Sequence, residues 1–404
     1  MERRPVVICF VTNLPLWSLA EGKGAPSFFN TIKMFVDRGH SVILLTTEDN
    51  PKLGVLRNKV NIVKIPRRAV IENRMFGGVF RLVHKHYSYM KSQRDITPYL
   101  EKYAITADIL YAYEIGFVPG VVKYARRTGK VCVGRFQGTV MTDLVQSVST
   151  VRKLRLYLQF FDHIRAMRAL PDVTIMTDDG TKGDRVLSYL RQHDSERVHF
   201  FKNGVDLPNA DHDDSTYQKL HAEGDIIFSS VCRLQRWKRV DRSIEIFSKF
   251  HARFKNSHYY IVGDGPEIEN LRKLVSQKGL QKNVSLVGAQ DKSEIYSLLN
   301  DTKYFLSSYE LSNLGNPLFE AISCGAVVAT LNNGSTSKMI VDGVTGLISD
   351  ENDFRRNALK LIECETKPEL LTMMRVAARN HLAINFDSWD QRMEREYDVL
   401  KTFL

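Results

Sequence analysis

The chain has 404 residues, of which 43% are hydrophobic and 25% charged, and its formal net charge is +11. This length and composition are typical of a globular protein with two or three domains. The apolar run near the start, residues 6–11, is far shorter than the roughly 18 residues of a membrane-spanning helix, so we interpret it as a first strand rather than a signal peptide. Five scattered cysteines without a CxxC pair argue against a disulfide framework or zinc spacing and favour the reducing cytoplasm.

The positive charge is concentrated in the first half of the chain. Residues 1–206 hold 32 Lys and Arg against 19 Asp and Glu, a net +13, whereas the remainder holds 25 against 27, a net −2. Residues 51–100 alone hold 11 basic and 2 acidic side chains, interleaved with Phe76, Phe80, Tyr87 and Tyr89. This pattern suits peripheral contact with an anionic membrane or an acidic acceptor, and a merely solvated basic surface is the alternative. Nucleic acid is the rival partner, but the sequence contains no nucleic-acid-binding motif, so we predict none.

Both halves alternate apolar strands with amphipathic helices, which is the pattern of parallel sheets built from βαβ units. In the first half, Gly22-Lys23-Gly24 precedes a helix that begins at Pro26 and ends before Gly39. The expected strands cover residues 5–11, 41–46, 60–65, 109–112, 131–135 and 173–177. We predict that this Rossmann-like domain spans residues 1–206.

Residues 207–224 are polar and lack an apolar period, so we place an interdomain linker there and expect a cleft between the domains. The second half predicts a Rossmann-like domain over residues 225–385. Its expected strands and helices alternate in the order strand 226–232, helix 240–250, strand 259–262, helix 267–277, strand 284–287, helix 294–299 and strand 303–308.

The most informative segment is 307–330, SSYELSNLGNPLFEAISCGAVVAT, which joins a strand, a polar glycine-bearing loop, a helix and another strand. Pro317 suits the first turn of that helix, and Gly325 suits its C-terminal exit. In open parallel sheets, ligands bind at the carboxyl ends of the strands, where the N-terminus of a helix presents N–H groups to phosphates. The segment therefore predicts a sugar-nucleotide site, with Asn313, Leu314, Gly315 and Asn316 facing the ligand.

Arg233 and Lys238 follow a strand of the second half and precede a helix, which places both charges at the carboxyl end of the sheet. Two fixed cations there would stabilise the negative charge that develops on a departing nucleotide. We expect Glu320 in the first turn of the helix after the glycine loop, as a ribose hydroxyl acceptor or simply as an acid favoured by the helix dipole. The sequence contains no HExxH, P-loop, nucleophile elbow or DxD pair in a suitable loop, so we predict no metal and no cofactor.

Several separated motifs together resemble a retaining glycosyltransferase of family 4, in the glycosyl transferases group 1, over nearly the full length. The matching segments are Gly22-Lys23-Gly24, Asn203-Gly204-Val205-Asp206, Arg233-Leu234 with Lys238, Val262-Gly263-Asp264-Gly265-Pro266, Glu320-Ala321 with Cys324-Gly325, and Asp342-Gly343 with Gly346. The resemblance implies an α/β GT-B fold, in which two Rossmann-like domains face across a cleft. It also implies that a final helix, residues 386–404, crosses back to the first domain.

The resemblance implies metal-independent transfer of a hexose from a nucleotide sugar, a UDP- or GDP-sugar, to a glycan or lipid-linked acceptor with retained anomeric configuration, as in polysaccharide biosynthesis. Arg233 and Lys238 would hold the diphosphate, Glu320 the ribose, and the loop around Gly24 would approach the donor. The donor would bind mainly to the second domain and the acceptor to the first, with closure excluding water.

The sequence departs from the family pattern at three positions. Ser312 stands where the first glutamate of the family's Glu-x7-Glu pair would lie, so either Ser312 and the amides of residues 313–316 bind the donor sugar, or Glu310 reaches in; we favour the former. Gln137, followed by Gly138, replaces a histidine that faces the donor sugar, and an amide cannot titrate. Lys338 stands where an acid is common.

Two other functions fit the same architecture. A nucleotide-sugar epimerase of this fold should show acid and base groups in the cleft rather than a cation pair. A catalytically silent scaffold that binds a sugar nucleotide is the second alternative, since Ser312 and Gln137 replace titratable groups. The scaffold would bind nucleotide without turning over any donor.

Overall fold

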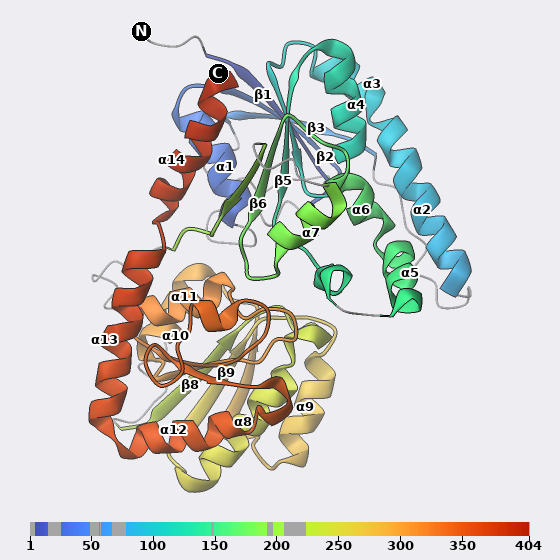
Figure 1. The fold of residues 1–404 in the computed structure, drawn as a ribbon. Helices are drawn as coiled ribbons and strands as arrows, with labels where there is room; N and C mark the ends of the chain where they lie inside the picture. Colours follow the sequence, from blue (N-terminus) through green and yellow to red (C-terminus); the bar gives the residue numbers. More distant parts are fainter. Residues whose placement is uncertain are drawn as a thin grey trace. The chain divides into compact units, whose positions relative to one another are not determined.

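The computed structural model describes residues 5–14, 26–48, 56, 58–66, 78–146, 149–191, 197–205 and 224–403. The chain divides into two compact units (Figure 1). Unit 1 comprises Met1–Asp178, Lys182–Lys202 and Asp390–Leu404, and unit 2 comprises Asp179–Thr181 and Asn203–Trp389. The predicted fold class is confirmed, because each unit is built on a parallel sheet flanked by helices. The expected linker, 207–224, lies almost wholly outside the described residues.

Unit 1 contains a seven-stranded sheet in the order β3-β2-β1-β4-β5-β6-β7, with every neighbouring pair parallel. Its strands are β1 (Val7–Thr12), β2 (Ser41–Thr46), β3 (Val60–Lys64), β4 (Ile109–Tyr113), β5 (Val131–Phe136), β6 (Val173–Thr177) and β7 (Val198–Phe201). Its helices are α1 (Pro26–Asp37), α2 (Gly78–Asp95), α3 (Thr97–Tyr103), α4 (Val118–Thr128), α5 (Thr150–Gln159), α6 (Phe161–Met167), α7 (Gly183–Arg191) and α14 (Trp389–Leu400). Both faces of the sheet are covered, which is why strands such as β4 are buried along their whole length.

Unit 2 contains a six-stranded parallel sheet in the order β10-β9-β8-β11-β12-β13. Its strands are β8 (Ile226–Val231), β9 (Ser257–Val262), β10 (Val284–Gly288), β11 (Tyr304–Ser307), β12 (Val327–Leu331) and β13 (Leu347–Ser349). Its helices are α8 (Val240–Arg253), α9 (Ile268–Gln277), α10 (Lys292–Asp301), α11 (Asn316–Ser323), α12 (Arg356–Thr366) and α13 (Pro368–Asn385). Separate apolar clusters pack on the two faces of this sheet.

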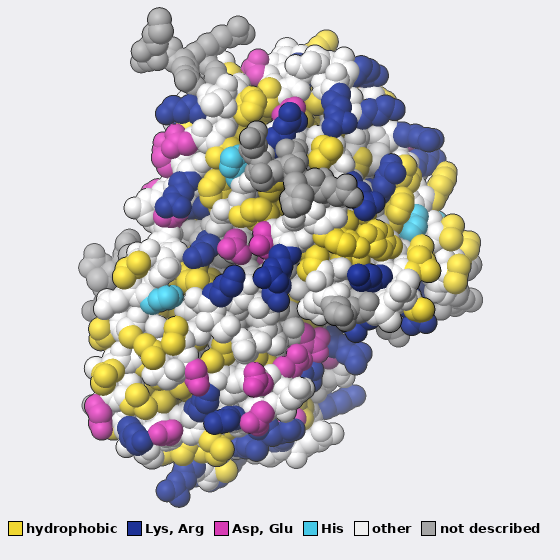
Figure 2. Space-filling model, viewed as in Figure 1, with side chains coloured by type: hydrophobic (Ala, Val, Ile, Leu, Met, Phe, Trp, Pro, Cys, Tyr) yellow, Lys and Arg dark blue, Asp and Glu magenta, His cyan; other side chains and the backbone are white. Residues whose placement is uncertain are grey.

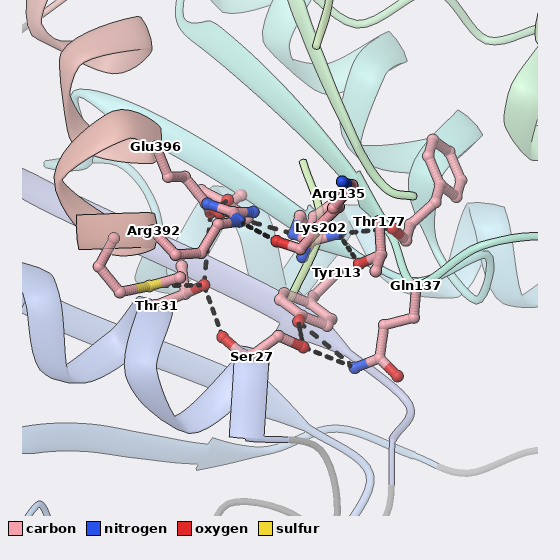
Figure 3. A network of polar contacts seen from close by, with 12 residues as sticks. Ser27, Thr31, Tyr113, Arg135, Gln137, Thr177, Lys202, Arg392 and Glu396 are labelled. Atoms are coloured by element: carbon pink, nitrogen blue, oxygen red, sulfur yellow. Dashed lines mark hydrogen bonds and ion pairs between the residues drawn. The ribbon is translucent and has the colours of Figure 1, made fainter. Parts of the chain in front are cut away.

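The last helix, α14, packs on unit 1 through a buried charged network (Figure 3). Arg392 and Glu396 on α14 form an ion pair at 2.7 Å, and Arg135 of β5 lies 3.8 Å from the same carboxylate. All three side chains are at most 1% exposed. The Tyr111 hydroxyl also donates to Glu396, and Arg392 Nε donates to the carbonyl of Lys202 at 3.0 Å. One buried carboxylate therefore attracts two buried guanidinium groups, which fixes α14 to the sheet.

Candidate functional site

Arg233 and Lys238 lie at the carboxyl end of β8, as the sequence predicts. Arg233 is exposed, and Lys238 closes a short 3-10 turn, Arg236–Lys238, directly before α8. The neighbouring glycine turn holds this loop in place, since Leu234 N donates to the Asp264 carbonyl at 2.8 Å. Gly263 has φ +134°, and a Cβ there would lie 1.8 Å from the Cys232 carbonyl, so only glycine permits the close approach.

Lys238 is enclosed by aromatic rings. Its Nζ lies 3.5 Å from the centroid of the Tyr309 ring and 4.1 Å from that of Trp237. Burial lowers the pKa of Lys238 from 10.5 to about 8, and the Arg233 guanidinium acts in the same direction. Sequence reasoning missed both rings, although Trp237 is adjacent to Lys238 in the chain. The result is a partly desolvated ammonium group that would gain most from an anionic ligand.

We expect nucleotide binding to weaken as the pH rises through about 8, because the ammonium form of Lys238 is the form that attracts phosphate. The slope should approach tenfold per pH unit, the limit for one proton linked to binding. Isothermal titration of a nucleoside diphosphate between neutral and alkaline pH measures this. Lys238→Arg is the control, because an arginine does not titrate in that range. An equally steep decline in Lys238→Arg would show that another group is responsible.

The loop after β11 is held by a completely buried side chain, that of Asn313. Its Oδ1 accepts hydrogen bonds from Ser307 Oγ at 2.8 Å and from Tyr309 N at 2.9 Å, and its Nδ2 donates to the Leu331 carbonyl at 3.2 Å. Asn313 N donates to Thr336, and Leu314 N donates to Ser312. The side chain of Asn313 thus shapes the loop from within.

Ser312 is buried against Asp179–Thr181, a short segment that belongs to unit 2 although it precedes α7 of unit 1 in the chain. Its Oγ donates to the Asp179 carbonyl at 2.7 Å. A Cβ on Gly180 would lie 2.5 Å from that same Oγ, and Gly180 has φ +79°. The turn at Asp179 therefore supports the loop and also contributes negative charge near Lys238.

Glu310 lies on a different side of the loop. It forms an ion pair with Arg239 at 2.9 Å and lines a cavity of about 310 Å³ together with residues of the β8–α8 connection and α9. Arg239 also pairs with Asp241 at 2.9 Å. Two residues were the alternatives for the role of the missing first glutamate. Glu310 contacts Arg239, whereas Ser312 lies in the loop that leads to α11.

Helix α11 begins at Asn316, with Gly315 as its N-cap and Pro317 in its first turn. The Oδ1 of Asn316 accepts a hydrogen bond from Asn203 Nδ2 at 2.9 Å. Because the helix begins at Asn316, Glu320 is its fifth residue, and the expectation of a first-turn acid is wrong. The positive end of the helix therefore does not account for a glutamate at this position.

Gln137 and Gly138 follow β5 in unit 1. The Nε2 of Gln137 donates to Ser27 Oγ at 3.3 Å and to the Tyr113 hydroxyl at 3.4 Å, and its side-chain oxygen points away from both partners (Figure 3). Gly138 has φ +112°, a conformation that favours glycine. Gln137 is therefore a fixed, uncharged hydrogen-bonding group. Gly24 lies outside the described residues.

No group of three or more His, Cys, Asp and Glu side chains in the described part of the chain is arranged to hold a metal ion. Among the helices that the structure describes, none combines the length and apolar character needed to cross a membrane.

Comparisons with known proteins show what the chain is similar to. Residues 211–381 match the family model described as "Glycosyl transferases group 1". The chain is 27% identical over 183 residues to N-acetyl-alpha-D-glucosaminyl L-malate synthase of Bacillus anthracis, covering 45% of this chain and 47% of that protein. It is 24% identical over 141 residues to alpha-monoglucosyldiacylglycerol synthase of Acholeplasma laidlawii, covering 35% of each. The chain thus spans between a third and a half of the length of these two relatives.

Solved structures show the fold over the whole chain. HepE of Anabaena, in complex with UDP and glucose, superposes with a TM-score of 0.71 at 15% identity, covering 98% of this chain and 100% of that one. WaaG, a glycosyltransferase involved in lipopolysaccharide biosynthesis, superposes with a TM-score of 0.71 at 18% identity, covering 97% and 99%. The chain therefore has the GT-B fold.

Proposed function

We propose that this protein is a retaining, metal-independent glycosyltransferase of family 4 that moves a sugar from a UDP- or GDP-sugar to a glycan or lipid-linked acceptor. The observation that carries the proposal is that two cations, Arg233 and Lys238, follow the carboxyl end of β8, with the ammonium group of Lys238 against the Tyr309 and Trp237 rings. A fixed ammonium group in a partly desolvated site stabilises a leaving diphosphate without reorganising during the reaction, and the exposed Arg233 adds a second positive charge. The matched family and the UDP-bound structural neighbour support it.

In this proposal, the donor contacts are divided among three parts of unit 2. Arg233 and Lys238 bind the diphosphate, and Glu320 accepts a hydrogen bond from the ribose. The amides of Gly315 and Asn316, at the start of α11, face the donor sugar, because the first N–H groups of a helix have no intrahelical acceptor. Ser312, Asn313 and Leu314 shape this loop, and Glu310 and Gly24 remain assigned to the donor side as predictions.

We propose that Gln137 and Gly138 of unit 1 lie on the side of the site that faces the acceptor and the donor sugar. The neutral amide of Gln137 can orient a hydroxyl but cannot act as a general acid or base. The two cations of unit 2 take the place that a divalent metal has in other glycosyl transfer reactions. The reaction should accordingly proceed at full rate in excess EDTA.

The proposal is tested by scanning fluorimetry against UDP, GDP, ADP and CDP and their common sugar conjugates, followed by product analysis. One nucleotide should raise the melting temperature selectively, and its sugar conjugate should be turned over with the anomeric configuration retained, as read by proton NMR. No shift with any nucleotide would contradict the proposal. The alternative, a silent scaffold, is favoured by the serine at position 312, and it would show the shift without nucleotide release from any donor or acceptor.

We also propose that the protein is cytoplasmic and that unit 1 makes peripheral contact with an anionic membrane. The support is the excess of Lys and Arg in residues 1–206, a net +13. A basic surface is attracted to anionic lipid by about 1 kcal/mol per Lys or Arg close to the membrane. Such contact would bring a lipid-linked acceptor to the enzyme.

A further inference from the structure

Unit 1 contains a second cavity, separate from the residues assigned to sugar transfer. It has a volume of about 590 Å³ and lies among α4, α5 and α6. Apolar and aromatic side chains form part of its wall, and four basic side chains form the rest. The lining residues are Pro119, Val122, Lys123, Arg126, Tyr157, Phe161, Ile164, Arg165, Arg168 and Ala169.

The four basic side chains of this cavity are not neutralised by carboxylates. None of Lys123, Arg126, Arg165 and Arg168 forms an ion pair with Asp or Glu among the described residues. The neighbouring carboxylate, Asp162, instead pairs with Lys85 at 2.9 Å. Four positive charges around one cavity repel one another, so an anion bound there would be stabilised by all of them.

Three of these cations are positioned by local contacts. Arg126 Nη2 donates to the carbonyls of Ala169 at 3.2 Å and Leu170 at 2.9 Å. The guanidinium carbon of Arg165 lies 5.8 Å from the centroid of the Phe161 ring, and that of Arg168 lies 5.9 Å from that of Tyr157. These are long cation–π distances, and Arg168 also lies within hydrogen-bonding reach of the Tyr157 hydroxyl, so the rings hold both guanidinium groups beside the cavity.

An exposed apolar stripe adjoins the cavity on α5. Val151 and Leu154 are each 62% exposed and Leu158 is 46% exposed, at a spacing that places them on one side of the helix. The Tyr157 of the cavity wall comes from the same helix. Single exposed apolar side chains are common on folded proteins, whereas a contiguous group of them marks an interaction surface.

The stripe continues onto α2, whose exposed apolar residues are Val79, Phe80, Val83 and Tyr87. Helix α2 is fastened to the end of α5, because His86 Nε2 donates to the Leu158 carbonyl at 2.7 Å and Lys85 Nζ donates to the Gln159 carbonyl at 3.0 Å. Figure 2 shows hydrophobic and basic side chains side by side over this part of unit 1. The surface therefore combines an anion-attracting cavity with an apolar border.

We propose that this cavity binds the phosphate of an anionic membrane phospholipid, while the apolar stripe of α5 and α2 inserts among the neighbouring acyl chains. Charge complementarity selects an anion, and the apolar border selects an amphiphile over a soluble phosphate. The inference rests on the proposed membrane contact and gives that contact a specific site, but it does not depend on sugar transfer.

The experiment is flotation of the full chain with vesicles of phosphatidylcholine alone or with one third phosphatidylglycerol. Wild type should float with the anionic vesicles, and inorganic phosphate at constant ionic strength should not displace it. The double variant Arg165→Ala/Arg168→Ala should bind about 30-fold more weakly, which is the fold-change for two basic residues at about 1 kcal/mol each. The matched control, Lys59→Ala/Lys102→Ala, removes two exposed charges of unit 1 that do not line the cavity, and it should lose less than about 3-fold.

A third variant, Val151→Ser/Leu154→Ser, leaves the charge unchanged and should abolish the part of binding that survives high salt. Equal losses in the cavity and control variants would overturn the assignment to the cavity while leaving a general electrostatic contact. Displacement of wild type by inorganic phosphate would identify a soluble-anion site instead. Absence of flotation in wild type would contradict the membrane contact itself, and neither result would affect the nucleotide-binding test of the proposed transferase.

Discussion

Replacing Glu396 with glutamine is expected to lower the free energy of unfolding by about 3–5 kcal/mol, because the change leaves Arg135 and Arg392 buried without a counter-charge. For a unit of this size, the melting temperature should fall by roughly 6–20 °C. Glutamine keeps the shape of the side chain, so the loss reports the charge rather than a cavity. Thermal and urea unfolding followed by circular dichroism measure it.

Glu394→Gln is the matched control for this prediction. Glu394 lies on the same helix and pairs with Arg38, but it is 56% exposed, so its loss should cost less than about 1 kcal/mol. Similar losses in both variants would mean that the network stabilises α14 no more than a surface ion pair does.

The same network makes the stability of unit 1 depend on acid. Burial by itself raises the pKa of Glu396, but the guanidinium groups of Arg392 and Arg135 and the Tyr111 hydroxyl hold it below its ordinary value. A carboxyl group with a lowered pKa contributes its full stability above the ordinary pKa of the unfolded chain and loses it as the pH falls toward the folded-state pKa. Wild type should therefore lose more stability than Glu396→Gln as the solution is acidified below the ordinary range of glutamate.

Lys238→Met is expected to have the largest effect on nucleotide binding. The change removes a charge-assisted contact worth about 1.5–3 kcal/mol, so the affinity for the nucleoside diphosphate should fall roughly 10- to 100-fold. If the ammonium group also stabilises the departing diphosphate, kcat should fall by about 10²–10³. Methionine preserves contact with the Tyr309 and Trp237 rings, which limits the structural disturbance.

Lys273→Met removes the same charge from the exposed face of α9 and should change neither the affinity nor kcat measurably. Titration calorimetry measures the nucleotide affinity of both variants, and initial rates measure their kcat, at the same ionic strength. A Lys238→Met protein that binds the nucleotide as tightly as wild type would remove Lys238 from the diphosphate site.

Much of the architecture was predictable because apolar periodicity and helix boundaries are local properties. The helix expected to begin at Pro26 does begin there, and Gly39, with φ +77°, follows its end. Most expected strands are observed within one or two residues of their predicted bounds. Strand β7 was not predicted as a strand, because Val198–Phe201 is short and only partly buried.

The candidate site was only partly predictable, because its supporting contacts join residues far apart in the sequence. The cations Arg233 and Lys238 are recognisable by their place after a strand. The contact of Ser312 with Asp179 spans 133 positions, and that of Tyr111 with Glu396 spans 285. No local pattern marks such pairs, and a buried arginine such as Arg135 has the same appearance in a sequence as a solvated one.

The place of Glu396 in the chain has a consequence for how the protein is made on the ribosome. Residues 203–388 are translated after the strands of unit 1 and before α14, so Arg135 is synthesised long before its counter-charge. Until α14 is released, the nascent sheet of unit 1 either keeps Arg135 in water or buries it uncompensated. Vectorial synthesis thus makes the first unit to be translated the last to reach its final packing.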